Sequence, residues 1–379
     1  VFAPVHREAG YPVTAAGDGA PRAVTEDVRD MPLPDYGEYF AELGGSLYKH
    51  LITPGIPMEF SRGCWWGAKS HCTFCGLNGG NMAYRSKRPE RVVDEMETLA
   101  ERYGTRRIEA VDNIMDMTYF REVLPRLAAR EEPLVLFFET KANLRKAQVE
   151  ALAAAGVQWI QPGIESLDSR VLKLMGKGCT AAQNVLLLKW CRQYGVRASW
   201  SVISEFPGEE DPWYAEMAAL MPALHHLQAG VTIPLRYDRY SPYHMRPDQY
   251  GLKLRPAGRY RHAYPIAEAD LGDQVYFFED EKPRPTGAER PGLRAMRIAM
   301  VEWRRIWRAA PPIVVMQDTA DGLAIEDTRP GRSDMVLRGV DRALVLAADD
   351  GPPETALRRT LAEDGHDEAA VTEAAERLI

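Results

Sequence analysis

The amino-acid sequence predicts an α/β protein, a partial (β/α)6 barrel followed by a small, winged-helix-like α+β module at the C-terminus. Six short apolar runs typical of strands alternate with helical patterns between residues 56 and 237. Such an alternation with short loops predicts a parallel sheet covered by helices. Six units are too few to close an eight-stranded barrel, so we expect a curved sheet that stays partly open.

The expected elements follow one another in a regular order. Strands are expected over residues 56–61, 107–111, 134–139, 158–164, 197–203 and 231–237, and helices over residues 89–103, 119–129, 144–155, 181–194 and 213–224. Pro89 lies near the start of the first helix and Gly104 follows its end. Thr180 is a typical cap for the helix over 181–194, and Gly195 is a typical stop.

Three parts are expected along the chain. Residues 1–55 are rich in Pro, Gly and short polar stretches, which predicts a linker or lead-in segment. Residues 56–285 form the barrel core in this prediction, including an aromatic stretch after Tyr237 that we expect mainly to fill a core. Residues 286–379 are expected to form a helix and a small module, in which three strand-like runs precede three helical runs.

The composition restricts the classes of function. A hydrophobic fraction of 45% and a charged fraction of 27% are typical of a globular protein. The net charge of −7 argues against nucleic acid as a partner held by bulk electrostatics. No apolar run reaches membrane-spanning length and no signal segment opens the chain. With five cysteines suited to a reducing compartment, the sequence predicts a cytoplasmic protein that binds no membrane.

Three of the five cysteines, Cys64, Cys72 and Cys75, fall within twelve residues. Three thiolate ligands leave one iron of a 4Fe–4S cluster open to a small molecule. A closed Zn site would need a fourth Cys or His, and His71 would crowd its neighbour Cys72. Cys179 and Cys191 stand alone in sequence that predicts helix, and both are expected to be small buried hydrophobes. The triplet therefore favours an open cluster, with structural Zn as the alternative.

Polar side chains follow several of the expected strands. Their positions are Glu109, Asp112 and Asn113 after strand two, Glu139 and Lys141 after strand three, and Glu165 and Ser166 after strand four. Ligands of parallel sheets bind at the carboxyl ends of the strands, and the cysteine loop follows strand one. We therefore expect several of these side chains to line one site next to the three thiols.

The same residues resemble the radical S-adenosylmethionine (SAM) superfamily, and most closely its ribosomal-peptide maturation branch, which is usually cobalamin-dependent. The resemblance is carried by five phrases: Arg62-Gly63-Cys64-Trp65-Trp66-Gly67 through Cys72-Thr73-Phe74-Cys75-Gly76-Leu77-Asn78-Gly79, Glu109-Ala110-Val111-Asp112-Asn113, Lys141-Ala142-Asn143, Gln161-Pro162-Gly163-Ile164-Glu165-Ser166 and Phe206-Pro207-Gly208-Glu209. The superfamily's usual cluster motif is C-x3-C-x2-C, whereas this chain has C-x7-C-x2-C. A second departure is Glu205, where relatives more often have Gly.

The resemblance implies roles for individual residues. Cys64, Cys72 and Cys75 would be the ligands of a 4Fe–4S cluster, and Phe74 would lie against the adenine of SAM. The segment containing Glu109, Asp112 and Asn113 sits where relatives hold the methionyl amine. Glu139, Glu165 and Ser166 sit where relatives hold ribose or carboxylate groups. No catalytic residue is assigned by the resemblance.

The resemblance also implies an activity. A radical SAM enzyme reductively cleaves SAM at its cluster, with flavodoxin or ferredoxin as electron donor, and here would modify a ribosomally synthesised precursor peptide. C-methylation with cobalamin is the first candidate outcome. Residues 1–55 leave no room for the cobalamin-binding domain of this branch, so that domain is expected to be absent from this chain. The alternatives are a cobalamin-independent maturase that cross-links or epimerises the peptide, and a Zn-stabilised peptide-binding protein.

Overall fold

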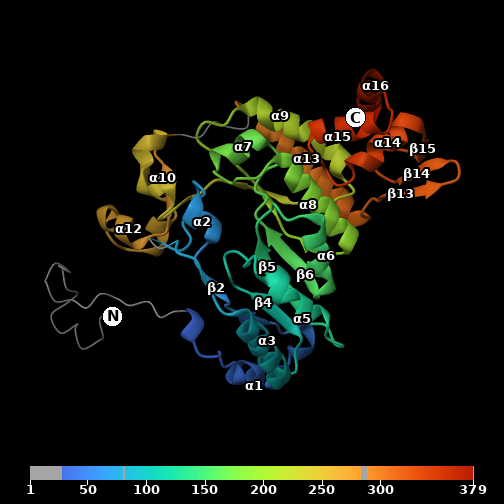
Figure 1. Ribbon diagram of the computed structural model, residues 1–379. Coiled ribbons are helices and arrows are strands. Elements are labelled where there is room, and N and C mark those ends of the chain that lie inside the picture. The colour runs from blue at the N-terminus through green and yellow to red at the C-terminus, as the bar shows by residue number, and fades with distance from the viewer. Residues whose placement is uncertain (1–27, 80–81, 283–287, 379) are drawn as a thin grey trace, which may run out of the picture.

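The computed structural model describes residues 28–79, 82–282 and 288–378. Its centre is a parallel sheet of five strands in the order β1-β4-β5-β6-β7 (Figure 1). These strands are β1 (Ile56–Met58), β4 (Arg107–Ala110), β5 (Val135–Thr140), β6 (Val157–Pro162) and β7 (Arg197–Ala198). After β7 the chain continues into β8 (Ser201–Ser204), which pairs in parallel with β9 (Val231–Pro234). The predicted six-unit, partly open α/β barrel is confirmed.

Helices cover the outer face of this sheet. They are α3 (Pro89–Tyr103), α4 (Tyr119–Glu122), α5 (Leu124–Ala128), α6 (Lys146–Ala154), α8 (Ala181–Tyr194) and α9 (Asp211–Leu220), which continues as η4 (Met221–Leu224). The predicted stops are confirmed, because Gly104 and Gly195 end α3 and α8 with left-handed φ values of 61° and 73°. A further short helix, α7 (Ser169–Leu174), was not predicted; Asp168 caps it by accepting two backbone N–H groups.

The two faces of the sheet differ, and this difference positions the site. Alternate residues of β5, such as Leu136 and Phe138, are buried against the helices. Between them, Phe137 and Glu139 face the inner side of the half barrel and are only partly buried. The inner face therefore carries both aromatic and charged side chains, as a ligand-binding surface does.

Helix α13 (Pro291–Ala309) packs against α9 and η4. Trp303 is fully buried there, and its Nε1 donates to the carbonyl of Leu227 at 2.9 Å. Leu293, Met296 and Met300 join the same core as the sheet. By its packing α13 belongs to the barrel, although we predicted it together with the terminal module. The predicted division of the chain at residues 55 and 285 stays a prediction.

The segment expected to be a linker contains helices where it is described. These are η2 (Val28–Asp30), α1 (Gly37–Gly45) and η3 (Lys49–Leu51). Phe40 stacks on Tyr103 of α3 with ring centroids 4.8 Å apart, which fixes α1 against the barrel. A short aromatic contact of this kind leaves no hydrophobic period for sequence analysis to detect. Residues 1–27 lie outside the described part of the chain.

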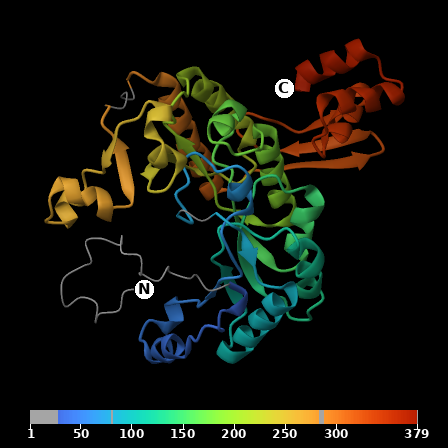
Figure 2. The ribbon, with the colours of Figure 1, turned by 60° about the vertical axis from the view of Figure 1, so that its left-hand side comes forward.

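The aromatic stretch after β9 forms a small unit of its own. Strands β10 (Tyr237–Asp238), β12 (Phe277–Asp280) and β11 (Leu254–Pro256) pair antiparallel in that order, with α10 (Pro242–Met245), η5 (Pro247–Tyr250), α11 (Tyr260–Ala263) and α12 (Glu268–Gln274) around them. Tyr237, Tyr243 and Phe278 are buried in a second core, as expected for most of these aromatic residues. This unit lies on the opposite side of the barrel from the C-terminal module (Figures 1 and 2).

The C-terminal module has the expected order of elements. Its antiparallel sheet is β13 (Val314–Thr319), β14 (Gly322–Asp327) and β15 (Met335–Leu337), followed by α14 (Gly339–Ala348), α15 (Glu354–Glu363) and α16 (Glu368–Leu378). Leu344, Leu361 and Val371 form a separate small core. Ion pairs from Lys146 and Lys189 to Asp349 tie the module to the barrel. The likeness to a winged helix stays a prediction.

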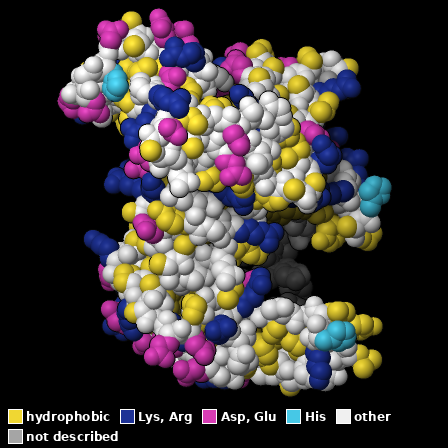
Figure 3. Space-filling model, turned by 90° about the vertical axis from the view of Figure 1, so that its right-hand side faces the viewer, with side chains coloured by type: hydrophobic (Ala, Val, Ile, Leu, Met, Phe, Trp, Pro, Cys, Tyr) yellow, Lys and Arg dark blue, Asp and Glu magenta, His cyan; other side chains and the backbone are white. Residues whose placement is uncertain are grey.

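The helices of the described residues are all too short or too polar to cross a membrane. In space-filling view a recess opens at the right-hand edge, between the upper and lower parts of the molecule, and Lys and Arg side chains lie beside it (Figure 3).

Candidate active site

The interval between Cys64 and Cys72 contains a short helix, α2 (Trp65–Lys69). Cys64 is its N-cap, and the Cys64 Sγ accepts a hydrogen bond from the Gly67 N–H at 3.3 Å. Trp65 Nε1 donates to the carbonyl of Met115 at 3.0 Å, and Trp66 Nε1 donates to the carbonyl of Gly176 at 3.2 Å. The unusual seven-residue spacing therefore forms a helical turn that two indoles hold in place.

The second half of the loop is held equally closely. The Cys75 N–H donates to the Cys72 carbonyl at 3.1 Å, and His71 Nε2 lies 2.8 Å from the Cys75 carbonyl. The Thr73 N–H donates to the carbonyl of Met175, just after α7. At Gly76 a Cβ atom would lie 2.1 Å from the Arg239 carbonyl, so only glycine fits this close approach. The loop is thus a rigid part of the barrel's rim.

The three thiols lie within electrostatic reach of one another. Burial raises the pKa of Cys72, Lys177 lowers it, and the thiol of Cys64 raises it again. Burial likewise raises the pKa of Cys75 to about 11, and Cys72 and Cys64 add to the rise. Thiols that are costly to ionise alone become stable ligands when a metal centre takes up their charge.

This arrangement fits a three-cysteine 4Fe–4S cluster. The three thiols come from one loop, are all half-buried, and share a single neighbourhood. The described residues contain no group of three or more His, Cys, Asp or Glu side chains placed to hold one metal ion. A cluster of four irons spans more space than a single ion, so its cysteine ligands stand further apart than those of a mononuclear site.

Two lysines lie beside the cysteine loop. Lys177 Nζ pairs with Glu165 Oε1 at 3.1 Å and lies 5.7 Å from the centre of the Phe74 ring. Lys141 Nζ donates to the carbonyl of Lys177 at 2.5 Å and lies 3.8 Å from the centre of the Trp66 ring. Burial lowers the pKa of Lys141. Burial acts in the same direction on Lys177, but Glu165 and Cys72 outweigh it and raise the pKa of Lys177.

Lys177 was not among the residues predicted for the site. Its signal is the string Gly176-Lys177-Gly178, in which both glycines adopt left-handed φ values of 66° and 63°. A Cβ at Gly178 would lie 2.1 Å from the Trp66 ring, so glycine lets the turn come close to α2. Cys179 lies in this loop before α8 and not in a helix as expected, whereas Cys191 is buried in α8 as predicted.

Glu139 and Glu165 are brought together as expected. Burial raises the pKa of Glu139, the charge of Glu165 raises it further, and Lys177 lowers it. Glu165 has a left-handed φ of 57°, and Ser201 Oγ lies 3.5 Å from its Oε2. The two carboxylates therefore form one polar group with Lys177 beside Phe74.

Asn113 and Glu109 are separated, although they were expected to act together. Asn113 Nδ2 donates to Asn78 Oδ1 at 2.8 Å. Both amides line a cavity of about 360 Å³ that also includes Gly63, the neighbour of Cys64. Glu109 instead pairs with Arg107 at 2.9 Å and lines another cavity, next to Phe137 and Trp159.

Asp112 and Ser166 are buried and bind the protein itself. Asp112 accepts the Phe60 N–H at 2.7 Å and the Ser61 O–H at 2.8 Å, and so fixes the chain just before the cysteine loop. Ser166 Oγ accepts the Asp168 N–H at 3.1 Å, and the residue has no exposed surface. Their predicted contacts with SAM stay predictions, as do those of Phe74, Glu109, Asn113, Glu139 and Glu165.

Asp112 should make stability depend on pH. Burial raises the pKa of its carboxyl to about 6, above the ordinary 3.8. The folded protein then binds the proton more tightly than the unfolded chain does. The stabilisation that this proton gives the folded state is therefore complete below about pH 4 and is lost as pH rises through 6. The loss amounts to at most about 3 kcal/mol. In Asp112→Asn the free energy of unfolding, measured in urea, should depend less on pH between these values. The exposed Asp94→Asn is the control, and an unchanged pH profile for Asp112→Asn would contradict this assignment.

The departure at Glu205 also has a structural reason. Glu205 adopts a left-handed φ of 76°, where glycine is unstrained and other residues are costly. Its carboxylate pairs with Arg297 of α13 at 2.5 Å, which offsets that strain. Glu209 Oε2 accepts the N–H groups of Glu205 and Phe206, each at 2.8 Å. The turn places Phe206 edge-on to Phe74, with ring centroids 6.0 Å apart.

Comparison with known proteins agrees with this geometry. Residues 58–221 match the family model described as the radical SAM superfamily. The chain contains a radical SAM domain. The matched residues include the cysteine loop and the strands from β4 to β8, so the expected radical SAM superfamily and fold are confirmed, whereas the ribosomal-peptide maturation branch stays a prediction.

Several curated relatives are named as methyltransferases, methylases or methylthiotransferases. The chain is 28% identical over 194 residues to "Uncharacterized methyltransferase PH0819" of Pyrococcus horikoshii, covering 50% of this chain and 40% of the relative. It is 23% identical over 200 residues to the hopanoid C-3 methylase of Methylococcus capsulatus, covering 51% and 36%. It is 28% identical over 192 residues to the ribosomal protein uS12 methylthiotransferase RimO of Solibacter usitatus, covering 46% and 40%. The chain thus spans two fifths or less of the length of these relatives.

Similar solved structures include the radical SAM methyltransferase TsrM from Kitasatospora setae, with cobalamin and a [4Fe-4S] cluster bound. The match has a TM-score of 0.46 and 20% identity, covering 54% of this chain and 42% of TsrM. The cobalamin-dependent radical enzyme OxsB with aqua-cobalamin matches with a TM-score of 0.40 and 18% identity, covering 51% and 30%.

Proposed function

We propose that this chain is the radical SAM part of an enzyme that modifies a ribosomally synthesised precursor peptide, with cobalamin-assisted C-methylation as the outcome. One observation carries the proposal: three half-buried thiols lie on a rigid loop at the rim of a half barrel, next to two lysines. When bound, a 4Fe–4S cluster would supply the electron that cleaves SAM reductively and an open iron for the methionyl group.

The chain's own residues would bind and orient the cofactor. Cys64, Cys72 and Cys75 would hold the cluster, and the positive charges of Lys141 and Lys177 would offset its negative charge. Phe74 offers an aromatic face next to Glu139 and Glu165, which suits an adenosine with its ribose hydroxyls. The amides of Asn78 and Asn113 line the cavity beside Gly63, where the methionyl end would lie.

Two observations support methyl transfer to a peptide as the reaction. The curated relatives are named for transfer of methyl or methylthio groups, and RimO is named for a ribosomal protein. The phrases shared with the peptide-maturation branch favour a peptide as the substrate. Cobalamin would come from an N-terminal domain that is not part of this sequence, and flavodoxin or ferredoxin would donate the electron. A cytoplasmic location follows from the same proposal, because the cluster needs a reducing compartment.

The test uses the whole protein to which this chain belongs, with any upstream continuation of its reading frame, and short candidate precursor peptides encoded near its gene. We expect the reconstituted, reduced protein to convert SAM to 5′-deoxyadenosine and to add a methyl group to the precursor when cobalamin is present, as seen by mass spectrometry. A peptide that loses hydrogens, or is epimerised without a change of mass, would contradict methylation and favour the cobalamin-independent alternative. A protein that binds the peptide and forms no 5′-deoxyadenosine would contradict enzyme function altogether.

The C-terminal module is the proposed contact for the leader part of the precursor. Strand β13 is an edge of its sheet, and Val315 and Met316 on it are exposed. Edge strands with exposed apolar side chains can pair with an extended peptide. Removing residues 310–379 should weaken precursor binding at least about tenfold while leaving the iron content unchanged. Equal peptide affinity in the soluble truncated protein, measured by fluorescence anisotropy, would refute this role.

A further inference from the structure

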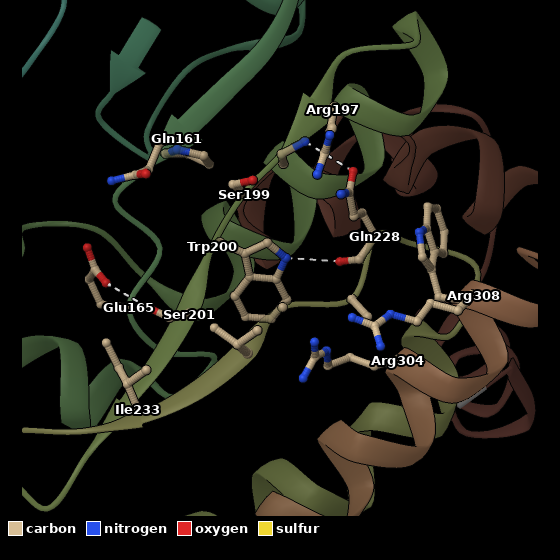
Figure 4. A pocket seen from close by; sticks show the side chains of 16 residues that line it. Gln161, Glu165, Arg197, Ser199, Trp200, Ser201, Gln228, Ile233, Arg304 and Arg308 are labelled. Atoms are coloured by element: carbon tan, nitrogen blue, oxygen red, sulfur yellow. Dashed lines mark hydrogen bonds between the residues drawn. The ribbon is translucent and has the colours of Figure 1, made fainter. Parts of the chain in front are cut away.

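A cavity of about 720 Å³ lies on the inner side of the half barrel, between β6 to β9 and the C-terminal half of α13 (Figure 4). This volume is typical of sites for small molecules or a few peptide residues. The floor and walls combine the ring of Trp200, the side chain of Ile233 and several polar groups. The indole Nε1 of Trp200 donates to the Gln228 carbonyl at 2.9 Å, which fixes the ring in the wall.

Three guanidinium groups line this cavity, from Arg197 on β7 and from Arg304 and Arg308 on α13. None of the three has a carboxylate partner among the residues that the structure describes. Arg197 lies over the ring of Trp159, 5.1 Å from its centre, and Arg304 and Arg308 extend from one face of α13 (Figure 4). Neighbouring Arg305, by contrast, pairs with Glu302 at 2.6 Å on the outer face of the helix.

The other end of the cavity adjoins the proposed radical site. Glu165 lines the cavity and pairs with Lys177, whose charge reaches Cys72. In Figure 4, Glu165 and Gln161 lie across the cavity from Arg304 and Arg308. One cavity therefore has an end next to the cofactor and an end rich in positive charge.

Uncompensated positive charges that line one hollow repel one another, and a bound anion relieves that repulsion. Guanidinium groups hold carboxylates through two parallel hydrogen bonds, which fix direction as well as position. We propose that Arg197, Arg304 and Arg308 bind a carboxylate of the substrate peptide and so hold a neighbouring residue towards the Glu165 end. This inference rests on the proposed peptide substrate. The carboxylate comes either from an Asp or Glu side chain or from the peptide's C-terminus.

The test measures peptide binding to the reconstituted, SAM-bound protein by calorimetry at low salt. The probes are a Gly-Ala-Glu-Ala-Gly peptide with both ends blocked, its Gln counterpart, and the Gln peptide with a free C-terminal carboxylate. We expect the Glu peptide or the free-acid peptide to bind at least about tenfold more tightly than the blocked Gln peptide. Which of the two binds identifies the source of the carboxylate, and added salt should weaken that binding.

Variants locate the binding to the cavity. Arg304→Gln with Arg308→Gln should remove the preference for the carboxylate, with a loss of about tenfold to a hundredfold in affinity, and Arg304→Lys should keep part of it. Arg305→Gln, on the outer face of the same helix, should bind like the wild type. Iron content and circular dichroism report whether each variant has folded.

Three results would overturn the inference. They are equal binding of all three probes, an unchanged preference in the double variant, and a loss confined to SAM affinity, which would assign the arginines to the cofactor. Formation of 5′-deoxyadenosine is measured separately in the wild type, so failure of the proposed function is seen independently of failure at this cavity.

Discussion

Replacing Cys64, Cys72 or Cys75 by Ala is expected to abolish reductive cleavage of SAM. The reason is that each thiol is one of the three proposed ligands on the loop, and two ligands would not hold a cluster with its open iron in position. The wild type should bind about four irons per chain after anaerobic reconstitution, and each variant clearly fewer. Iron and sulfide analysis and the yield of 5′-deoxyadenosine check this result.

Cys191→Ala is the matched control for the three variants. Burial raises the pKa of Cys191 to about 12, so its thiol is unreactive and lies within the core. Cys179→Ala should also keep its iron, because burial raises the pKa of the Cys179 thiol even though the charges of Lys141 and Lys177 act to lower it. Full iron content and activity in Cys72→Ala would show that the cluster is held elsewhere.

Lys177→Met is expected to lower both stability and SAM affinity. The side chains of Lys177 and Glu165 are 12% and 18% exposed, so the substitution leaves a largely buried carboxylate without its partner. Breaking such a pair costs roughly 3 kcal/mol. It also removes a positive charge beside Cys72, where the cluster and the carboxylate of SAM would bring negative charge. Urea unfolding and calorimetric titration with SAM measure the two effects.

A double variant separates these effects. Lys177→Met with Glu165→Gln has no unpaired buried charge, so stability should recover while SAM affinity stays low. Lys173→Met, an exposed lysine on α7, should change neither quantity. Recovery of SAM affinity in the double variant would mean that the charge of Lys177 plays no part in cofactor binding.

The barrel could be predicted because its signals are local. Apolar runs gave the strands, and residues such as Thr180 and Gly195 mark helix ends through contacts within a few positions. Helix α7 has only six residues and no full apolar period, so its pattern was too short to detect. The position of α13 was missed for another reason, because its apolar face fits either the barrel or the module until the packing partner is known.

The site was predictable in its cysteines and less so in its surroundings. The carboxyl ends of the strands bring polar residues to one rim of the barrel. Beyond the end of a strand, however, side chains no longer alternate between the two faces, so the sequence does not predict which way each one points. Asp112 and Ser166 therefore turned inward, whereas Glu139 and Glu165 turned towards the site. Lys177 is separated from Cys72 by more than a hundred residues, so no local pattern connects the two.

The two indole hydrogen bonds of α2 imply that the number of residues between the first two cysteines is a poor guide to whether a chain belongs to the radical SAM superfamily. Trp65 and Trp66 supply a pair of attachment points, on the carbonyls of Met115 and Gly176, which do not depend on the number of residues between the cysteines. Insertions between the first two cysteines can then vary in length without moving the thiols, provided that each insertion carries its own donors. A search that demands three intervening residues would pass over such chains, whereas one that asks for two tryptophans directly after the first cysteine would retrieve them.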